Sequence, residues 1–165
     1  MPNVTKLLVI EEGCRNTPYY CKLGYPTIGI GQRIGPKGAP LDQYPIVMPN
    51  EVAAIWLNCN LRTLAGILKQ DPVTGAAWVT CNDARQAILL SMAYQMGVDG
   101  LRKFRNTLQH IARSKFELAA SEMLDSAWAS PAQTPERARR HAEQMRTGIW
   151  HNYYHNRTKE IIWTF

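Results

Sequence analysis

The chain has 165 residues, of which 45% are hydrophobic and 19% are charged, a composition typical of a globular protein rather than a disordered or fibrous one. Its formal net charge of +6 at pH 7 favours a polyanionic partner such as nucleic acid, an acidic membrane or a carboxylate-rich cell wall. No stretch approaches the roughly 20 apolar residues of a membrane span, and no secretory signal is visible at the start. We therefore expect a soluble protein that stays in the cytoplasm unless it is released.

The N-terminal half predicts a short helix, a strand-and-turn region and a long helix. Residues 5–12 are largely apolar and are followed by Gly13, a helix stop. Residues 19–34 are rich in aromatic residues, Thr and Ile between glycines, which is typical of short strands and turns, and residues 36–49 continue as a loop. Apolar residues recur at three- and four-residue steps over residues 50–70, which predicts a long helix.

The next predicted helix covers residues 84–96 and is closed by Gly97. Thr80, with Asp83 three residues later, resembles a capping box at its start. Because this segment is apolar on nearly every face, we expect it to run through the core.

Two further helices are predicted after it. Ser114 and Glu117 form a second capping box ahead of residues 116–124. Thr134-Pro135 begins a helix over residues 136–147, and Gly148 ends it. The arginines of this last helix form either a solvated face or a substrate-facing patch.

The strand pattern before Arg33 and the helical pattern from Asn50 onward indicate an α+β fold with two lobes in a single domain, covering residues 1–165. We expect a small mixed lobe over about 13–60, with a β-hairpin sheet. A long connecting helix would lead to a larger helical lobe over about 70–165, which would also take the N-terminal helix.

The cysteines are scattered without a C-x-x-C pair, so the spacing of metal ligands is missing and we expect neither a metal nor a cofactor. Without a secretion signal the four are expected to be thiols. Three of them, Cys14, Cys59 and Cys81, occupy positions that suit burial. Whether these three pair in an oxidising compartment stays open.

Glu12 is the first candidate for chemistry, because it ends an apolar helix beside the glycine-rich segment 24–31. Glycosidic cleavage needs a proton donor for the leaving oxygen and a held water on the other face of the sugar, and a carboxyl group with apolar neighbours suits the donor role. Glu11 points about 100° away on the helix. Alone, such a glutamate is more often a surface charge, and the hairpin can be purely structural.

No single motif identifies a family here, but several motifs in chain order do so in combination. They are Glu12-Gly13-x-Arg15, Tyr19, Gly24-Tyr25-x-Thr27-Ile28-Gly29-Ile30-Gly31, Tyr94-Gln95-Met96-Gly97, Phe104-Arg105-Asn106, Trp128, Gln133-Thr134-Pro135-x-Arg137-Ala138 and Arg146-Thr147-Gly148-x-Trp150. Together they resemble the lysozyme of T-even phages and its relatives, glycoside hydrolase family 24.

The resemblance implies a muramidase that hydrolyses, with inversion, the β-1,4 bond between N-acetylmuramic acid and N-acetylglucosamine in peptidoglycan. It implies that Glu12 is the general acid, that Thr27 positions the attacking water, and that both open onto a cleft between the lobes. Arg15 would support the acid. The glycan and its stem peptide would run along the helical lobe past Gln95, Asn106 and Arg137.

Cys21 departs from the family pattern, because most members hold an aspartate between the acid and the threonine. A thiolate can act as base, nucleophile or water positioner, and all three roles stay open. Lys22 and Arg15 would favour the thiolate, and Glu12 would disfavour it.

A second departure concerns an ion pair that the family commonly forms between a histidine after the hairpin and an aspartate on the long helix. Gln32 and Asn60 occupy these positions here. Both are neutral, so a hydrogen bond could survive without its pH dependence.

Three functions remain in competition. The first is an endolysin, a monomeric muramidase that passes from the host cytoplasm to the periplasm and cell wall after holin action. The second is a catalytically impaired peptidoglycan-binding module. The third, a nucleic-acid-binding protein, is supported only by charge, and the absence of interleaved aromatic residues argues against it.

Overall fold

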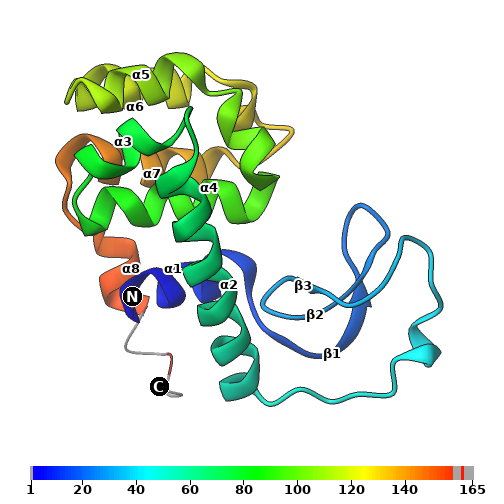
Figure 1. The fold of residues 1–165 in the computed structure, drawn as a ribbon. Helices are drawn as coiled ribbons and strands as arrows, with labels where there is room; N and C mark the ends of the chain where they lie inside the picture. Colours follow the sequence, from blue (N-terminus) through cyan, green and yellow to red (C-terminus); the bar gives the residue numbers. More distant parts are fainter. Residues whose placement is uncertain (1, 158–160, 162–165) are drawn as a thin grey trace. The chain divides into compact units, whose positions relative to one another are not determined.

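The computed structural model describes residues 2–157 and 161. These residues form eight α-helices and a three-stranded antiparallel sheet, which confirms the predicted α+β fold (Figure 1). They divide within one helix into two compact units, residues 2–60 with 157 and 161, and residues 61–156. The predicted helical lobe extends to residue 165, and its residues 158–160 and 162–165 lie outside the described part.

The first unit opens with helix α1, Pro2–Glu12. Gly13 follows it with a φ of +71°, in the left-handed region that favours glycine, and its N–H donates to the carbonyl of Val9. The predicted helix stop is therefore confirmed.

The sheet of the first unit consists of β1 (Arg15–Tyr20), β2 (Pro26–Gly29) and β3 (Gln32–Arg33), with β2 in the centre. The turn between β2 and β3 requires glycine at Gly29, whose φ is +61°. A Cβ atom there would lie 2.5 Å from Oε1 of Gln32. That oxygen instead accepts the N–H of Ile30, so the turn and the start of β3 are fixed together.

After a loop with a single 3-10 turn, η1 (Leu41–Gln43), the long helix α2 spans Asn50–Gln70, as predicted. Hydrogen bonds tie its first turns to the preceding elements: Asn16 donates to the Asn50 side chain, and Thr5 donates to Asn58. Helix α1, the strands and the first half of α2 fall in the same compact unit.

The second unit contains the end of α2 and the remaining helices. Their bounds are α3 (Gly75–Thr80), α4 (Asp83–Arg102), α5 (Arg105–Ala112), α6 (Phe116–Leu124), the 3-10 helix η2 (Ala127–Ala129), α7 (Pro135–Thr147) and α8 (Asn152–Arg157), whose last residue clusters with the first unit. Helix α6 packs against both α5 and α7, and α4 packs against α7.

Helix α4 runs through the core as predicted, with Ile88, Leu89, Leu90 and Met92 almost fully buried. Gly97 leaves helical geometry with a φ of +78°, and one further turn continues to Arg102. The predicted stop at Gly97 is thus a break within α4.

Both predicted capping boxes are wrong in position. The side chain that caps α4 is Asn82, which accepts the N–H of Arg85, whereas Thr80 ends α3 and donates to the carbonyl of Ala76. Ser114 has a φ of +57°, which does not suit an N-cap residue. Pro135 at the first position of α7 and Gly148 beyond its end are confirmed.

Within the described ranges, no helix combines the length and the apolar character needed to cross a membrane.

Candidate active site

Glu12, the predicted proton donor, is the last residue of α1 and is half-buried. The turn before it is apolar, with Leu8 and Val9 buried. Glu11 is also half-buried, but the two carboxylates leave the helix about 100° apart. The structure therefore offers two distinct carboxylate directions at this helix end.

Tyr19 on β1 lies within electrostatic reach of both Glu12 and Cys21. The pKa of its phenol is raised, first by burial and then by the negative charges of Glu12 and Cys21, while Arg15 opposes this. The Arg15 guanidinium lies 4.5 Å from the centroid of the Tyr19 ring. Tyr19 is thus a neutral, polar neighbour of the predicted site, whereas the sequence indicated it only as part of the family motifs.

Strand register places Thr27 in the middle of a row across the sheet. Tyr19 on β1 pairs with Thr27 on β2, and Thr27 pairs with Arg33 on β3. Directly paired residues point to the same face of a sheet. Tyr19, Thr27 and Arg33 therefore share one face, while Ile28 and Gln32 lie on the other.

Cys21 follows β1 directly and begins the turn back to β2. Its N–H donates to the carbonyl of Tyr25 at 3.0 Å, and its carbonyl accepts the N–H of Gly24 at 2.8 Å. Partial burial raises the pKa of the thiol. Hydrogen bonds from the backbone N–H groups of Tyr25 and Leu23 and from the Thr27 hydroxyl, together with the charge of Arg33, outweigh this effect, so the pKa falls below its ordinary value.

The groups that favour the Cys21 thiolate differ from the predicted ones. We expected Lys22 and Arg15 to favour it, whereas the cation that acts on the sulfur is Arg33, whose guanidinium lies 3.6 Å from the Tyr25 ring centroid. The backbone donors follow from the turn geometry, which residue spacing alone does not specify.

Thr27 is buried, with 3% of its surface exposed, less than the open position expected from the sequence. Its hydroxyl donates to the carbonyl of Tyr25 at 2.9 Å and also bonds Cys21. A hydroxyl has a single proton. The Thr27 hydroxyl can therefore donate to the Tyr25 carbonyl while Cys21 is a thiol, and to the Cys21 sulfur when Cys21 is a thiolate.

Gln32 keeps a hydrogen bond to α2, but not to the predicted partner. Its amide donates to the backbone carbonyl of Ala53 at 2.9 Å, rather than to Asn60. The side-chain oxygen is occupied by Ile30. The bond therefore holds β3 to the start of α2 without any titratable group.

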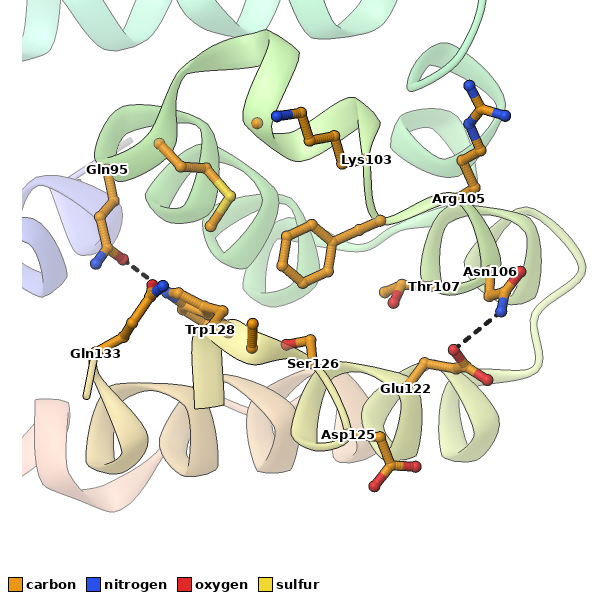
Figure 2. A pocket seen from close by; sticks show the side chains of 14 residues that line it. Gln95, Lys103, Arg105, Asn106, Thr107, Glu122, Asp125, Ser126, Trp128 and Gln133 are labelled. Atoms are coloured by element: carbon orange, nitrogen blue, oxygen red, sulfur yellow. Dashed lines mark hydrogen bonds between the residues drawn. The ribbon is translucent and has the colours of Figure 1, made fainter. Parts of the chain in front are cut away.

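A pocket of about 730 Å³ lies in the second unit. Two residues implied to bind substrate, Gln95 and Asn106, line it, and Figure 2 shows them at opposite ends. Gln95 accepts the indole N–H of Trp128 at 3.0 Å, and Asn106 donates to Glu122 at 3.2 Å. Within this pocket, Gln95 is therefore held by an aromatic side chain, Trp128, and Asn106 is held by a charged one, Glu122.

Arg137, the third residue implied to bind substrate, does not line this pocket. It is 5% exposed, and its guanidinium donates to the Ser91 hydroxyl at 2.8 Å. The same hydroxyl lies 2.7 Å from Nε2 of His141, whose pKa is held well below its ordinary value, chiefly by burial and then by the charge of Arg137. Arg137 is therefore anchored in the helical core.

The four cysteines, all in the described part of the chain, are thiols and not disulfides. Cys81 is buried as expected, and burial raises the pKa of its thiol to about 12. Cys14 is half-buried and donates to Asn50 at 3.4 Å. Cys59, however, is exposed, because it lies on the outer face of α2. Among residues 2–157 and 161, no group of three His, Cys, Asp or Glu side chains is arranged to hold a metal ion.

A helix that ends in Glu12, followed by a short antiparallel sheet and a helical unit, defines a lysozyme-type α+β protein. Residues 10–143 match the family model described as phage lysozyme. The chain belongs to the phage lysozyme family.

Relatives of this chain include two proteins of different organisation. The pre-baseplate central spike protein Gp5 of Enterobacteria phage T4 is 30% identical over 170 residues, which cover 92% of this chain and 29% of that protein. Probable T4-type lysozyme 1 of Dictyostelium discoideum is 26% identical, over 92% of this chain and 98% of that protein. The chain thus spans less than a third of the first relative and nearly all of the second.

Proposed function

We propose that the protein is a muramidase that hydrolyses the β-1,4 bond between N-acetylmuramic acid and N-acetylglucosamine in peptidoglycan. The observation that carries the proposal is the match of residues 10–143 to the phage lysozyme family model. The half-buried Glu12 at the end of α1 supports the same reaction. So does the turn that brings Cys21 and Thr27 together, because the Cys21 N–H and the Thr27 hydroxyl both donate to the carbonyl of Tyr25.

In the proposed reaction Glu12 donates its proton to the glycosidic oxygen as the bond to the anomeric carbon breaks. A water attacks that carbon from the other face of the sugar, which inverts its configuration. Thr27 orients the attacking water, and the Cys21 thiolate accepts a proton from that water. Glu12 then recovers a proton from solvent, and Cys21 returns one, so that the enzyme is unchanged after each turnover.

Lysis of outer-membrane-permeabilised cells, followed by turbidity, tests the proposal. Glu12→Gln should lose activity by a factor of at least about 10², because an amide has no acidic proton to give. Glu11→Gln is the matched control and should stay close to wild type. Circular dichroism should show both variants folded. Equal losses in the two variants, or a larger loss in Glu11→Gln, would contradict the assignment of Glu12.

A sedimentation experiment with purified wall addresses the alternative of a catalytically impaired wall-binding module. Such a module would sediment with purified wall but release no soluble fragments. Mass spectrometry of the supernatant, with wild-type protein and Glu12→Gln in parallel, would reveal muropeptides only if the protein is an active muramidase.

For the biological setting we propose an endolysin that acts as a monomer, accumulates in the host cytoplasm and reaches the periplasm and wall through a holin. The match to nearly the full length of a T4-type lysozyme supports a free enzyme. The match to a central spike protein favours a second candidate, a lysozyme domain of a particle component. Mass spectrometry of purified phage particles separates the two, since a free endolysin would be absent from them.

A further inference from the structure

Arg33 is an exposed cation of the first unit that stands in the same row of the sheet as Thr27. Register pairs Arg33 on β3 with Thr27 on β2, and Thr27 in turn pairs with Tyr19 on β1. Because directly paired residues share a face of the sheet, the Arg33 side chain emerges on the same face as Thr27. Its position beside the candidate site therefore comes from the pairing of the three strands (Figure 1).

The ring of Tyr25 holds the Arg33 guanidinium close to the turn that contains Cys21. The centre of the guanidinium lies 3.6 Å from the ring centroid, well within the roughly 6 Å reach of a cation–π interaction. The backbone carbonyl of Tyr25 accepts the N–H of Cys21 at 3.0 Å and the hydroxyl of Thr27 at 2.9 Å. Tyr25 therefore binds Cys21 and Thr27 through its carbonyl and Arg33 through its ring.

The charge of Arg33 is not neutralised by an ion pair within the described part of the chain. Two arginines of α7 show the contrast, since Arg139 pairs with Glu136 and Arg146 pairs with Glu143. The charges of α7 thus form mainly a self-paired surface. The positive charge of Arg33, by contrast, is available to act on the groups around it.

Two ionisable side chains on neighbouring strands act on the Cys21 sulfur. One is the phenol of Tyr19 on β1. Burial raises its pKa, and the negative charges of Glu12 and Cys21 raise it further against the opposing charge of Arg15, so the phenol is neutral. The other is Arg33 on β3. Burial raises the pKa of the Cys21 thiol, whereas hydrogen bonds and then the charge of Arg33 lower it.

We propose that Arg33 is a positioning residue of the reaction, which favours the thiolate form of Cys21, and that the Tyr25 ring holds Arg33 where its charge reaches the sulfur. In this role Arg33 contacts neither the sugar nor the attacking water and acts through Cys21. The inference rests on the proposed function, in which the Cys21 thiolate accepts a proton from the attacking water. Without the cation, more of the protein would hold a neutral thiol, which cannot accept that proton.

The pH dependence of Cys21 alkylation tests this inference without any need for hydrolysis. The parent protein is Cys59→Ser, because Cys59 is exposed, whereas burial raises the pKa of both Cys14 and Cys81. Iodoacetamide reacts with the thiolate, so its rate at Cys21, read by peptide mass mapping at each pH, gives the midpoint of ionisation. Arg33→Met should move this midpoint to higher pH and slow alkylation at neutral pH about threefold.

Further variants separate the charge of Arg33 from its placement. Arg33→Lys keeps the charge and should recover part of the shift. Tyr25→Leu keeps the backbone carbonyl but removes the ring, so it should shift the midpoint in the same direction as Arg33→Met. The double variant should match Arg33→Met alone, because the ring acts only through the guanidinium. Lys22→Met is the matched control: it removes a cation next to Cys21 in the chain and should keep the parent midpoint.

Salt distinguishes an electrostatic role of Arg33 from a structural one. Added NaCl screens the charge of an exposed arginine, so the difference in midpoint between the parent and Arg33→Met should shrink as the salt concentration rises. Thermal unfolding should show every variant folded under the conditions of alkylation. A difference in midpoint that does not change with salt would overturn the electrostatic role.

Hydrolysis of wall links the midpoint to the reaction. The fall of kcat at low pH should move to higher pH in Arg33→Met and Tyr25→Leu by the same amount as the alkylation midpoint. An unshifted kcat profile would overturn the inference, because Arg33 would then act on a thiol that the reaction does not use.

The two assays also separate this inference from the proposed function. An unchanged alkylation midpoint in Arg33→Met, or an equal shift in Lys22→Met, would overturn the inference whether or not the protein hydrolyses wall. Absence of hydrolysis by the wild-type protein would overturn the proposed function, while a shifted midpoint would still establish the effect of Arg33 on Cys21.

Discussion

At the residue scale, Cys21 occupies the position where the family resemblance led us to expect an aspartate, and its surroundings favour ionisation of the thiol. The sulfur meets N–H groups of its own turn, the Thr27 hydroxyl and the charge of Arg33, which together lower its pKa despite partial burial. Ionisation of this thiol is thus easier than in an ordinary cysteine.

If the Cys21 thiolate acts in the reaction, substitutions of Cys21 should differ in the activity that they retain. Cys21→Asp should remain active, while Cys21→Ser and Cys21→Ala should lose about 10²-fold in kcat if the thiolate is the base. A base works only when deprotonated, so wild-type activity should fall as pH drops through the Cys21 pKa, which lies below 9.0. Because a carboxylate ionises at lower pH, this fall should move to lower pH in Cys21→Asp. Full activity in Cys21→Ala would exclude the sulfur from the reaction.

Alkylation gives an independent test, provided that Cys59 is removed first. Cys59 is exposed and would react alongside Cys21, so the parent protein should be Cys59→Ser. Iodoacetamide should inactivate this parent, because its thiolate is the reactive form, and should leave Cys59→Ser with Cys21→Asp active. Peptide mass mapping identifies the modified residue. Inactivation of both proteins at the same rate would place the sensitive group elsewhere.

At the element scale, the turn between β2 and β3 fixes the pairing of the two strands, and Thr27 lies on β2. Gly29→Ala should destabilise the protein by about 2 kcal/mol or more, because the new Cβ would meet Oε1 of Gln32 at 2.5 Å in a left-handed backbone. Gly66→Ala is the matched control. Gly66 lies within α2 with nothing within 4 Å of an added Cβ, so alanine there should stabilise the protein by about 0.5 to 1 kcal/mol. Thermal unfolding measures both changes.

The junction between α2 and α3 depends on Asp71. Its carboxylate accepts hydrogen bonds from Arg102, Val73 and Thr74, and the Arg102 guanidinium, with these backbone donors, lowers its pKa from 3.8 to about 2. A depressed carboxyl pKa contributes stability that is present above 3.8 and is lost as pH falls through about 2.

Asp71→Asn should therefore lower the free energy of unfolding at neutral pH by about 1 to 2 kcal/mol, a value reduced for the partial exposure of Arg102. The difference from wild type should shrink as pH falls from about 4 toward 2. Urea titrations across this range measure it. Asp99→Asn is the control, because Asp99 also pairs with Arg102 but is 89% exposed, and it should change stability little. A difference that stays constant with pH would contradict this account.

At the scale of the whole molecule, the net charge of +6 should matter for encounter with an anionic wall. Long-range attraction is screened by salt, so hydrolysis of intact wall should slow several-fold between about 0.05 M and about 0.5 M NaCl. Hydrolysis of a short peptide-free oligosaccharide of alternating N-acetylglucosamine and N-acetylmuramic acid, which carries far fewer charges, should change far less. Equal salt dependence on the two substrates would show that charge acts on the fold or the reaction rather than on encounter.

The sequence alone determined the elements whose signals are local. Helix α2 has the predicted bounds because its apolar residues repeat at helical spacing and Asp71-Pro72 follows it. The start of α7 at Pro135 and its end before Gly148 follow from the backbone preferences of those two residues. The family motifs in chain order predicted that Glu12 and Thr27 belong to one site, with Cys21 between them in the sequence.

Tertiary structure decided what depends on contacts between distant residues. Strand register put Arg33 beside Thr27 and Cys21, and turn geometry aimed two N–H groups at the sulfur. Packing of the helices buried Arg137 on Ser91 and left Cys59 exposed. None of these follows from spacing along the chain, because each is set by which elements meet and by the face that each presents.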